Sequence, residues 1–152
     1  MTGVRLERRL PHPPDRVFAF VTEEARVLTW WGHNGTEVVD PALSFDREGP
    51  WRATLRFRDG REMTMAGHVT HVDRPRSVGF TWRWSGADEW DDAESHVTIR
   101  LDPAPDGGTD LTLDHVRLPE ATDWPARQER GWGSTLARLE AALAANAKGD
   151  AR

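Results

Sequence analysis

In this 152-residue chain, the histidines are the residues whose type and spacing come closest to a catalytic or metal-binding site. His115 follows Leu111 and Leu113 at two-residue steps, and a β-strand would place all three side chains on its inward face. His115 is then either a buried histidine bonded to a backbone group, or a hydrogen-bond donor or general base at the wall of a cavity. The sequence leaves both interpretations open.

A metal site would need several ligands on one face. His68 and His71 lie three residues apart, and on a strand they point to opposite faces unless a bulge intervenes. The chain has no cysteine, which excludes thiolate metal sites, disulfides and a cysteine nucleophile. The sequence therefore predicts no metal and no cofactor.

Catalytic motifs are also missing from the sequence. Ser134, in GWGST, falls within a predicted helix rather than on the strand-to-helix turn of a G-x-S-x-G motif. The glycines of EGPWR and GGTD do not form a phosphate-binding pattern. No catalytic residue is assigned, and the sequence does not decide whether the protein is an enzyme.

Acidic residues surround Trp90 in a polar segment that we expect to be a solvated loop. They are Asp88, Glu89, Asp91, Asp92 and Glu94. Trp90 either closes over a ligand or pins this loop to the domain.

Tryptophan is unusually frequent, with eight residues, whereas tyrosine is absent. Each indole brings a large apolar surface and one N–H donor. Such a number in a small domain indicates an aromatic-lined cavity.

The overall composition limits the class of protein: 30% of residues are charged, the net charge is −5, and one domain is expected. The negative charge argues against nucleic-acid binding, and the lack of a long apolar run argues against membrane insertion, so a cytoplasmic location is expected.

The first third of the chain predicts a strand and two short helices. Alternation through Val4, Leu6 and Leu10 indicates the strand, and Pro14 opens the first helix. Thr22 is expected to cap a second helix that runs to Trp31. The segment 36–45 predicts two weak strand pieces broken by a proline.

A hairpin follows from residue 51, and its register can be predicted. A three-residue loop at Arg58-Asp59-Gly60 would place Leu55 opposite Met63 and Trp51 opposite Gly67, so that the apolar faces agree. We expect the glycine opposite the indole to leave space there. Three further strands, with alternation that includes Val78–Trp84 and Val97–Leu101, complete a meander.

One long helix from Asp123 to about Ala147 is expected to cover the sheet. Trp132, Leu136, Leu139 and Leu143 recur at helical spacing and form its inner stripe. Gly131 and Gly133 flank the tryptophan, and we expect a close approach of another backbone there.

The order of these elements resembles the helix-grip fold of the START-like (SRPBCC) superfamily, and local stretches resemble the branch named after the activator of Hsp90 ATPase. Those stretches are RVFAFVTEEARVLTWWG, EGPWR, GHVTHVDRPRSVGFTWRW, GTDLTLDHVRL and RGWGSTLARLEAAL. The resemblance implies an α+β fold in which a curved antiparallel sheet of about six to seven strands wraps around a long C-terminal helix. It implies one domain over residues 1–147, and the sequence predicts a disordered tail over 148–152.

The resemblance also implies a cavity between sheet and helix that binds a small apolar or aromatic molecule. One alternative is an enzyme of cyclase or dehydratase type that uses His115. The other is an Hsp90 co-chaperone, although the activators that this chain resembles carry an additional N-terminal domain for which it has no room. A homodimer remains open. The predicted ligand-binding residues are Trp31, Trp51, Phe57, Met65, Phe80, Trp82, Trp84, His115, Trp132 and Leu136.

Overall fold

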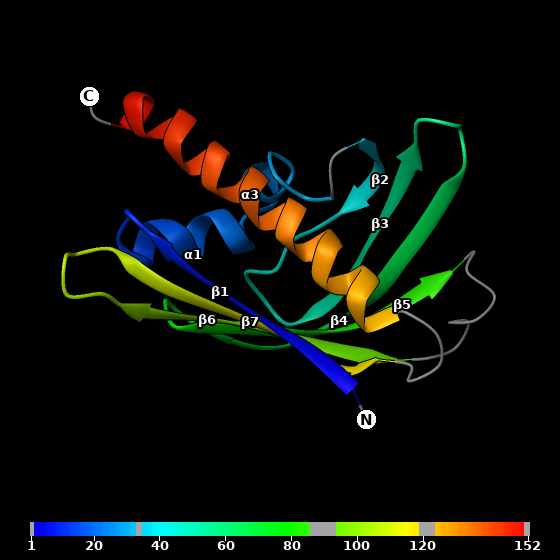
Figure 1. Ribbon diagram of the computed structural model, residues 1–152, viewed down its shortest axis with the longest axis horizontal. Coiled ribbons are helices and arrows are strands. Elements are labelled where there is room, and N and C mark those ends of the chain that lie inside the picture. The colour runs from blue at the N-terminus through cyan, green and yellow to red at the C-terminus, as the bar shows by residue number, and fades with distance from the viewer. Residues whose placement is uncertain (1, 33–34, 86–93, 119–123, 151–152) are drawn as a thin grey trace.

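The protein folds as a curved antiparallel sheet with one long helix across its concave face (Figure 1). The computed structural model describes residues 2–32, 35–85, 94–118 and 124–150. The helices are α1 (Pro14–Thr22), α2 (Glu24–Val27) and α3 (Trp124–Asp150). The strands are β1 (Thr2–Leu10), β2 (Thr36–Ala42), β3 (Gly49–Phe57), β4 (Glu62–Asp73), β5 (Ser77–Ser85), β6 (Ser95–Pro103) and β7 (Thr109–Leu118).

The sheet has the strand order β1-β7-β6-β5-β4-β3-β2, and every neighbouring pair is antiparallel. The first strand of the chain therefore pairs with the last one, while β2 to β7 follow one another as a meander. This is the predicted helix-grip arrangement, with two short helices after the first strand, and it is confirmed. Helix α3 extends through Asp150, into the segment expected to be disordered.

The β3–β4 hairpin has the register predicted from the three-residue loop. Leu55 pairs with Met63, and Trp51 pairs with Gly67. Gly60 takes a left-handed conformation with φ of 89°, and its N–H donates to the Phe57 carbonyl at 2.9 Å. The match of apolar faces was therefore a sufficient guide to the register.

The expectation of space beside Gly67 was wrong. A Cβ on this residue would lie 1.9 Å from the Thr81 carbonyl oxygen and 2.8 Å from Trp51 Nε1. The indole of Trp51 reaches across the glycine and donates to that same carbonyl at 3.0 Å. Glycine is needed here because a neighbouring backbone approaches closely.

The segment after α1 also differs from the prediction. Thr22 is the last residue of α1, and its hydroxyl donates to the Phe18 carbonyl at 2.7 Å instead of capping the next helix. Glu23 occupies the N-cap position of α2, which ends at Val27. A threonine hydroxyl can bond back to a carbonyl four residues earlier, and here that option wins. The segment from 36 is one strand with an irregular register between Val39 and Ala42, rather than two pieces.

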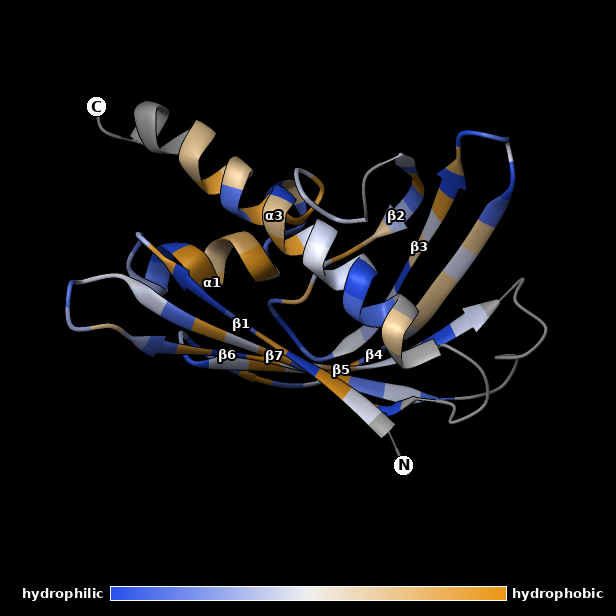
Figure 2. Ribbon diagram, in the orientation of Figure 1, coloured by the Kyte–Doolittle hydropathy of each residue, from blue (hydrophilic) through white to orange (hydrophobic). Residues whose placement is uncertain are grey.

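The inner stripe of α3 is buried as predicted. Trp132 is 4% exposed and Leu143 is fully buried. The C-terminal half of the helix lies beside α1 over the sheet (Figure 1), and Arg16 of α1 donates to the Leu143 carbonyl at 3.0 Å. Helix α1 and the part of α3 above it consist largely of residues in orange and tan, the colours of apolar side chains (Figure 2). We call this region the filled half of the space between helix and sheet.

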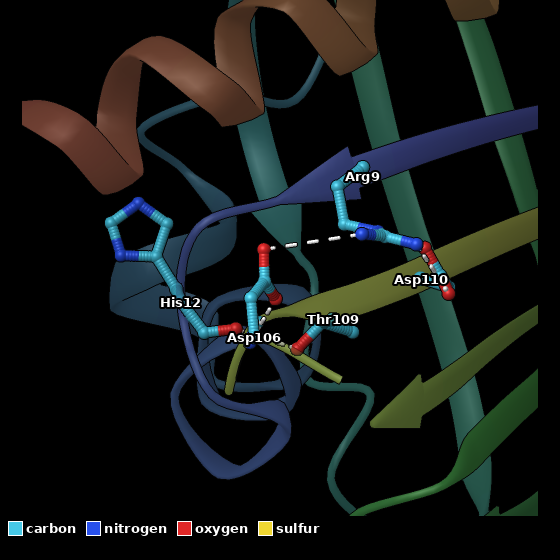
Figure 3. A network of polar contacts seen from close by, with 6 residues as sticks. Arg9, His12, Asp106, Thr109 and Asp110 are labelled. Atoms are coloured by element: carbon cyan, nitrogen blue, oxygen red, sulfur yellow. Dashed lines mark hydrogen bonds and ion pairs between the residues drawn. The ribbon is translucent and has the colours of Figure 1, made fainter. Parts of the chain in front are cut away.

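Polar contacts hold the ends of β1 and β7 together beside this half (Figure 3). Arg9 forms an ion pair with Asp110, the residue that it faces across the two strands. Thr109 donates its hydroxyl hydrogen to the His12 carbonyl at 2.6 Å. These contacts fix the chain where it leaves β1 for α1.

Candidate functional site

A cavity of about 390 Å³ lies beneath the N-terminal half of α3, between this helix and strands β3 to β5. The helix and the sheet each contribute to its wall, and Trp31 and Gly32, which precede β2, complete it. The lining residues are Trp31, Gly32, Leu55, Phe57, Arg61, Met63, Met65, Trp82, Trp84, Gln128, Arg130, Gly131, Trp132, Ser134 and Thr135. We call this region the hollow half of the space between helix and sheet.

The inner stripe of α3 changes character where it reaches the cavity. Gln128, Gly131 and Thr135 lie at helical spacing on the same side as Trp132. Gly131 does not mark a close backbone approach, as the sequence had suggested, because a Cβ there would meet no heavy atom of the described residues within 4 Å. A Cβ on Gly133 would lie only near the Arg8 side chain, at 4.0 Å. The missing side chain at Gly131 thus contributes to open space.

Trp31 is the centre of an aromatic cluster whose members Trp82 and Trp132 also line the cavity. Its ring is stacked on that of Trp82, with centroids 5.6 Å apart and an interplanar angle of 25°. It meets Trp51 at 5.6 Å and Trp132 at 6.2 Å, both edge to face. Such aromatic pairs add stability beyond the area that they bury. The cluster joins the segment after α2 to the sheet and to α3.

An arginine from α3 holds Trp31 in this position. Nη1 of Arg138 donates to the carbonyls of Trp31 and Gly32, at 3.1 and 2.9 Å. These carbonyls lie in the segment after α2, and the arginine gives both of them a partner in a partly buried place. Arg138 therefore fastens this turn to α3.

The buried indoles differ in whether their N–H groups have partners. Trp30 donates to the Phe20 carbonyl at 2.8 Å, and Trp51 and Trp132 also have acceptors. The N–H groups of Trp31 and Trp82 are buried and have no acceptor among the described residues. Unsatisfied buried donors are rare in native proteins and cost about 1–3 kcal/mol each. Both belong to residues that line the cavity.

His115 is fully buried behind the cavity wall and does not line the cavity. Its Nδ1 accepts a hydrogen bond from Trp132 Nε1 at 3.0 Å, so the ring proton lies on Nε2. Nε2 in turn donates to Ser95 Oγ at 2.7 Å, and that hydroxyl donates to the Trp82 carbonyl at 3.2 Å. This chain of bonds connects α3 through β7 and β6 to β5.

Burial, and to a lesser extent the neighbouring His96, lowers the pKa of His115 from 6.5 to about 3. The imidazole is therefore neutral at physiological pH, with its basic nitrogen engaged by an indole. The sequence had allowed a backbone partner or a base at the cavity wall, and the observed partners are side chains.

The predicted ligand-binding residues fall into two groups. Six line the cavity: Trp31, Phe57, Met65, Trp82, Trp84 and Trp132. Trp51, Phe80, His115 and Leu136 are buried outside its lining. The binding role of all ten stays a prediction.

The predicted binding residues omit most of the polar lining of the cavity and the apolar residue Met63. Met63 could have been predicted, because the expected register puts it on the apolar face of the hairpin. Gln128 and Thr135 carry no signal of their own, and only their spacing from Trp132 indicates that they share its side of the helix. Arg130 lies two residues from Trp132, a spacing that does not share a helix face, so the sequence gives no signal for it. Arg61 follows the hairpin loop, where an exposed arginine is common.

A bulge between Val69 and His71 does interrupt β4, which was the condition for His68 and His71 to share an ion. His68 is nevertheless exposed, while His71 Nε2 lies 3.3 Å from Ser77 Oγ. Among the described residues no group of three or more histidine, aspartate or glutamate residues could hold a metal ion.

Trp90 and its acidic neighbours, apart from Glu94, lie outside the described residues. No helix of the described part is long and apolar enough to cross a membrane.

A sheet closed over one long helix, with an aromatic cavity between them, defines a helix-grip protein. The family model "Activator of Hsp90 ATPase homolog 1-like protein" matches residues 11–144, and the chain belongs to this family. No functionally curated protein matches the chain.

Solved structures show the same fold. The AHSA1 protein from Silicibacter pomeroyi is 39% identical with a TM-score of 0.87, and the alignment covers 95% of this chain and 99% of that one. CalU16 from Micromonospora echinospora is 23% identical with a TM-score of 0.66, over 93% of this chain and 75% of that one. DynU16, a protein in the dynemicin biosynthetic locus, is 25% identical with a TM-score of 0.69, over 93% of this chain and 46% of that one.

Proposed function

We propose that the protein binds a small aromatic or apolar molecule in the hollow half of the space between α3 and the sheet. The observation that carries this proposal is the cavity itself, about 390 Å³ in volume, whose wall is mainly aromatic and aliphatic. A concave, largely apolar site with a few polar groups is typical of small-molecule binding.

Two further observations support the proposal. The buried N–H groups of Trp31 and Trp82 have no acceptor within the described part of the chain, so two hydrogen-bond donors of the aromatic wall are unsatisfied there. CalU16 and DynU16 share the fold, and DynU16 is described as belonging to a biosynthetic locus. At least one protein with this fold therefore belongs to a locus for the biosynthesis of a small molecule.

The enzymatic alternative receives less support from the geometry. His115 was its base, but the accepting nitrogen of this residue is bonded to Trp132 and the ring lies outside the cavity lining. A general base must come within hydrogen-bond reach of the proton that it abstracts. Binding without chemistry thus remains the function that the site supports best.

Two matched glycine substitutions test the proposal. Gly131→Leu should fill the cavity without a clash, since no atom in the described ranges lies within 4 Å of the new Cβ. It should abolish binding of a fluorescent apolar dye such as N-phenyl-1-naphthylamine. Gly133→Leu lies two residues away and outside the cavity lining, and should bind as the wild type does. Both changes should stabilise the helix by a similar amount, about 0.5–1 kcal/mol.

The dye titration is read from the fluorescence increase and from the displacement of the dye by aromatic competitors. Equal affinities in Gly131→Leu and Gly133→Leu would place the dye elsewhere, and absence of binding to the wild-type protein would contradict the proposal itself.

A further inference from the structure

The polar residues of the cavity are gathered on α3 and at the start of β4, where they border an otherwise apolar wall. The charged ones are Arg61 and Arg130, and no aspartate or glutamate is among the described lining residues. The chain as a whole has a net charge of −5. The cavity therefore carries charge of the opposite sign to the protein.

The two arginines are not equivalent. Arg61 Nε donates to Asp59 Oδ2 at 2.7 Å, and its guanidinium lies over the Phe57 ring at 5.2 Å. Asp59 therefore offsets much of its charge. Arg130 is exposed beside Gly131 and makes no ion pair with any described residue. An arginine in this state can receive a carboxylate without giving up another partner.

A second, independent observation concerns Gln128, one turn of α3 before Gly131 and Trp132. This side chain is only 9% exposed, lines the cavity, and makes no hydrogen bond with a described residue. A buried amide normally has partners for its two N–H groups and its oxygen. Gln128 and Arg130 line the same cavity, so a ligand there is within reach of both side chains.

The geometry points to an aromatic carboxylate as the ligand class: a planar apolar body among the indoles, with its carboxylate at the rim accepting hydrogen bonds from Arg130 and Gln128. This inference rests on the proposed function and adds the charge and orientation of the ligand. An apolar body is received by Trp31, Trp82 and Trp132, while the anion stays near water, where an arginine pair costs little desolvation.

The test compares two probes of nearly equal shape, 2-naphthoate and the neutral 2-naphthamide, by titration of tryptophan fluorescence. Wild-type protein should bind naphthoate more tightly. Arg130→Gln should lower the affinity for naphthoate about three- to fivefold, as expected for the loss of an exposed ion pair. The affinity for naphthamide should stay unchanged. The naphthoate preference should also shrink as salt is raised to about 1 M.

Three variants make the result specific. Arg100→Gln removes one positive charge from the exposed face of β6, away from the cavity, and should leave both affinities unchanged. Gln128→Leu should lower the affinity for both probes, because each probe offers an oxygen atom to the amide N–H groups. Asp59→Asn should raise the affinity for naphthoate alone, since it removes the carboxylate that offsets the charge of Arg61.

Naphthamide that binds as tightly as naphthoate, with Arg130→Gln affecting neither, would overturn the inference and leave the proposed function intact. Equal losses in Arg130→Gln and Arg100→Gln would also overturn it, because net charge would then be responsible. Failure of both probes to bind the wild-type protein would overturn the inference together with the proposed function.

Discussion

The filled and hollow halves of the space between helix and sheet are covered by the same helix, α3, and differ in what that helix presents. Towards its C-terminus it offers Leu139 and Leu143, which are 1% and 0% exposed. Towards its N-terminus it offers Gln128, Gly131 and Thr135 around a single tryptophan. The helix also changes from apolar to polar colouring between these ends (Figure 2). The same stripe of side chains on α3 thus closes a packed core at one end and forms the wall of a cavity at the other.

The largest contrast should appear on truncation to alanine. Leu143→Ala should lower the free energy of unfolding by about 2–5 kcal/mol, because it leaves a hole in a closely packed region. Met63→Ala removes a similar volume from the wall of the cavity, where part of the side chain faces open space, and should cost less than about 1 kcal/mol. Urea unfolding measures both changes. Similar losses would mean that the two halves are packed alike.

A second pair of variants separates satisfied indoles from unsatisfied ones. Trp132→Phe leaves His115 Nδ1 without its donor and should cost about 1–3 kcal/mol more unfolding free energy than Trp31→Phe. The indole N–H of Trp31 has no acceptor among the described residues and so loses no hydrogen bond there. Each change removes a comparable apolar area, so the difference in unfolding free energy isolates the hydrogen bond. A smaller loss for Trp132→Phe would contradict the assigned chain of bonds.

The buried histidine makes stability depend on pH in a predictable direction. The pKa of His115 is about 3 in the folded protein and near 6.5 when unfolded, so the unfolded state binds more protons between these values. The part of the folding stability that depends on neutral His115 is therefore complete above pH 6.5. It is lost as the pH falls towards 3. Between pH 7 and pH 5 we expect about 2 kcal/mol of this loss.

His115→Gln is the control for this prediction, because it removes the titrating group. Urea unfolding at several pH values should give a flatter pH profile for this variant than for the wild type. Parallel profiles would show that His115 is accessible to protons in the folded state.

The smallest expected effect concerns helix propensity at the cavity. Gly131→Ala should raise the midpoint of thermal unfolding slightly, by an amount equivalent to about 1 kcal/mol at most, since the new Cβ would meet no atom among the residues that the structure describes. Gly67→Ala is the opposite case, because its Cβ would lie 1.9 Å from the Thr81 carbonyl oxygen, and it should destabilise the protein. A loss of stability in Gly131→Ala would show that the cavity is narrower than described.

The fold could be predicted because its determinants are periodic. Strand alternation, the loop at Gly60 and the helical spacing of Trp132, Leu136, Leu139 and Leu143 each have a short-range signal. The family resemblance then supplied the arrangement of sheet and helix.

The site could be predicted only in part, because packing has no such local signal. Gly67 and Gly131 are both glycines next to tryptophans in space or sequence, yet one fills a close contact and the other borders a cavity. The partners of His115 come from β6 and α3, and nothing in the sequence around it indicates Ser95 or Trp132. Thr22 shows the same limit, since its hydroxyl had two acceptable uses.

The central claim, that ligands bind in the hollow half, is tested most directly by the indole N–H signals in a two-dimensional NMR spectrum of the assigned, labelled protein. On titration with 2-naphthamide the signals of Trp31, Trp82 and Trp132 should shift, because these rings line the cavity. The signal of Trp30, bonded to the Phe20 carbonyl outside the lining, should stay in place. A shift at Trp30 without shifts at Trp82 and Trp132 would contradict the account.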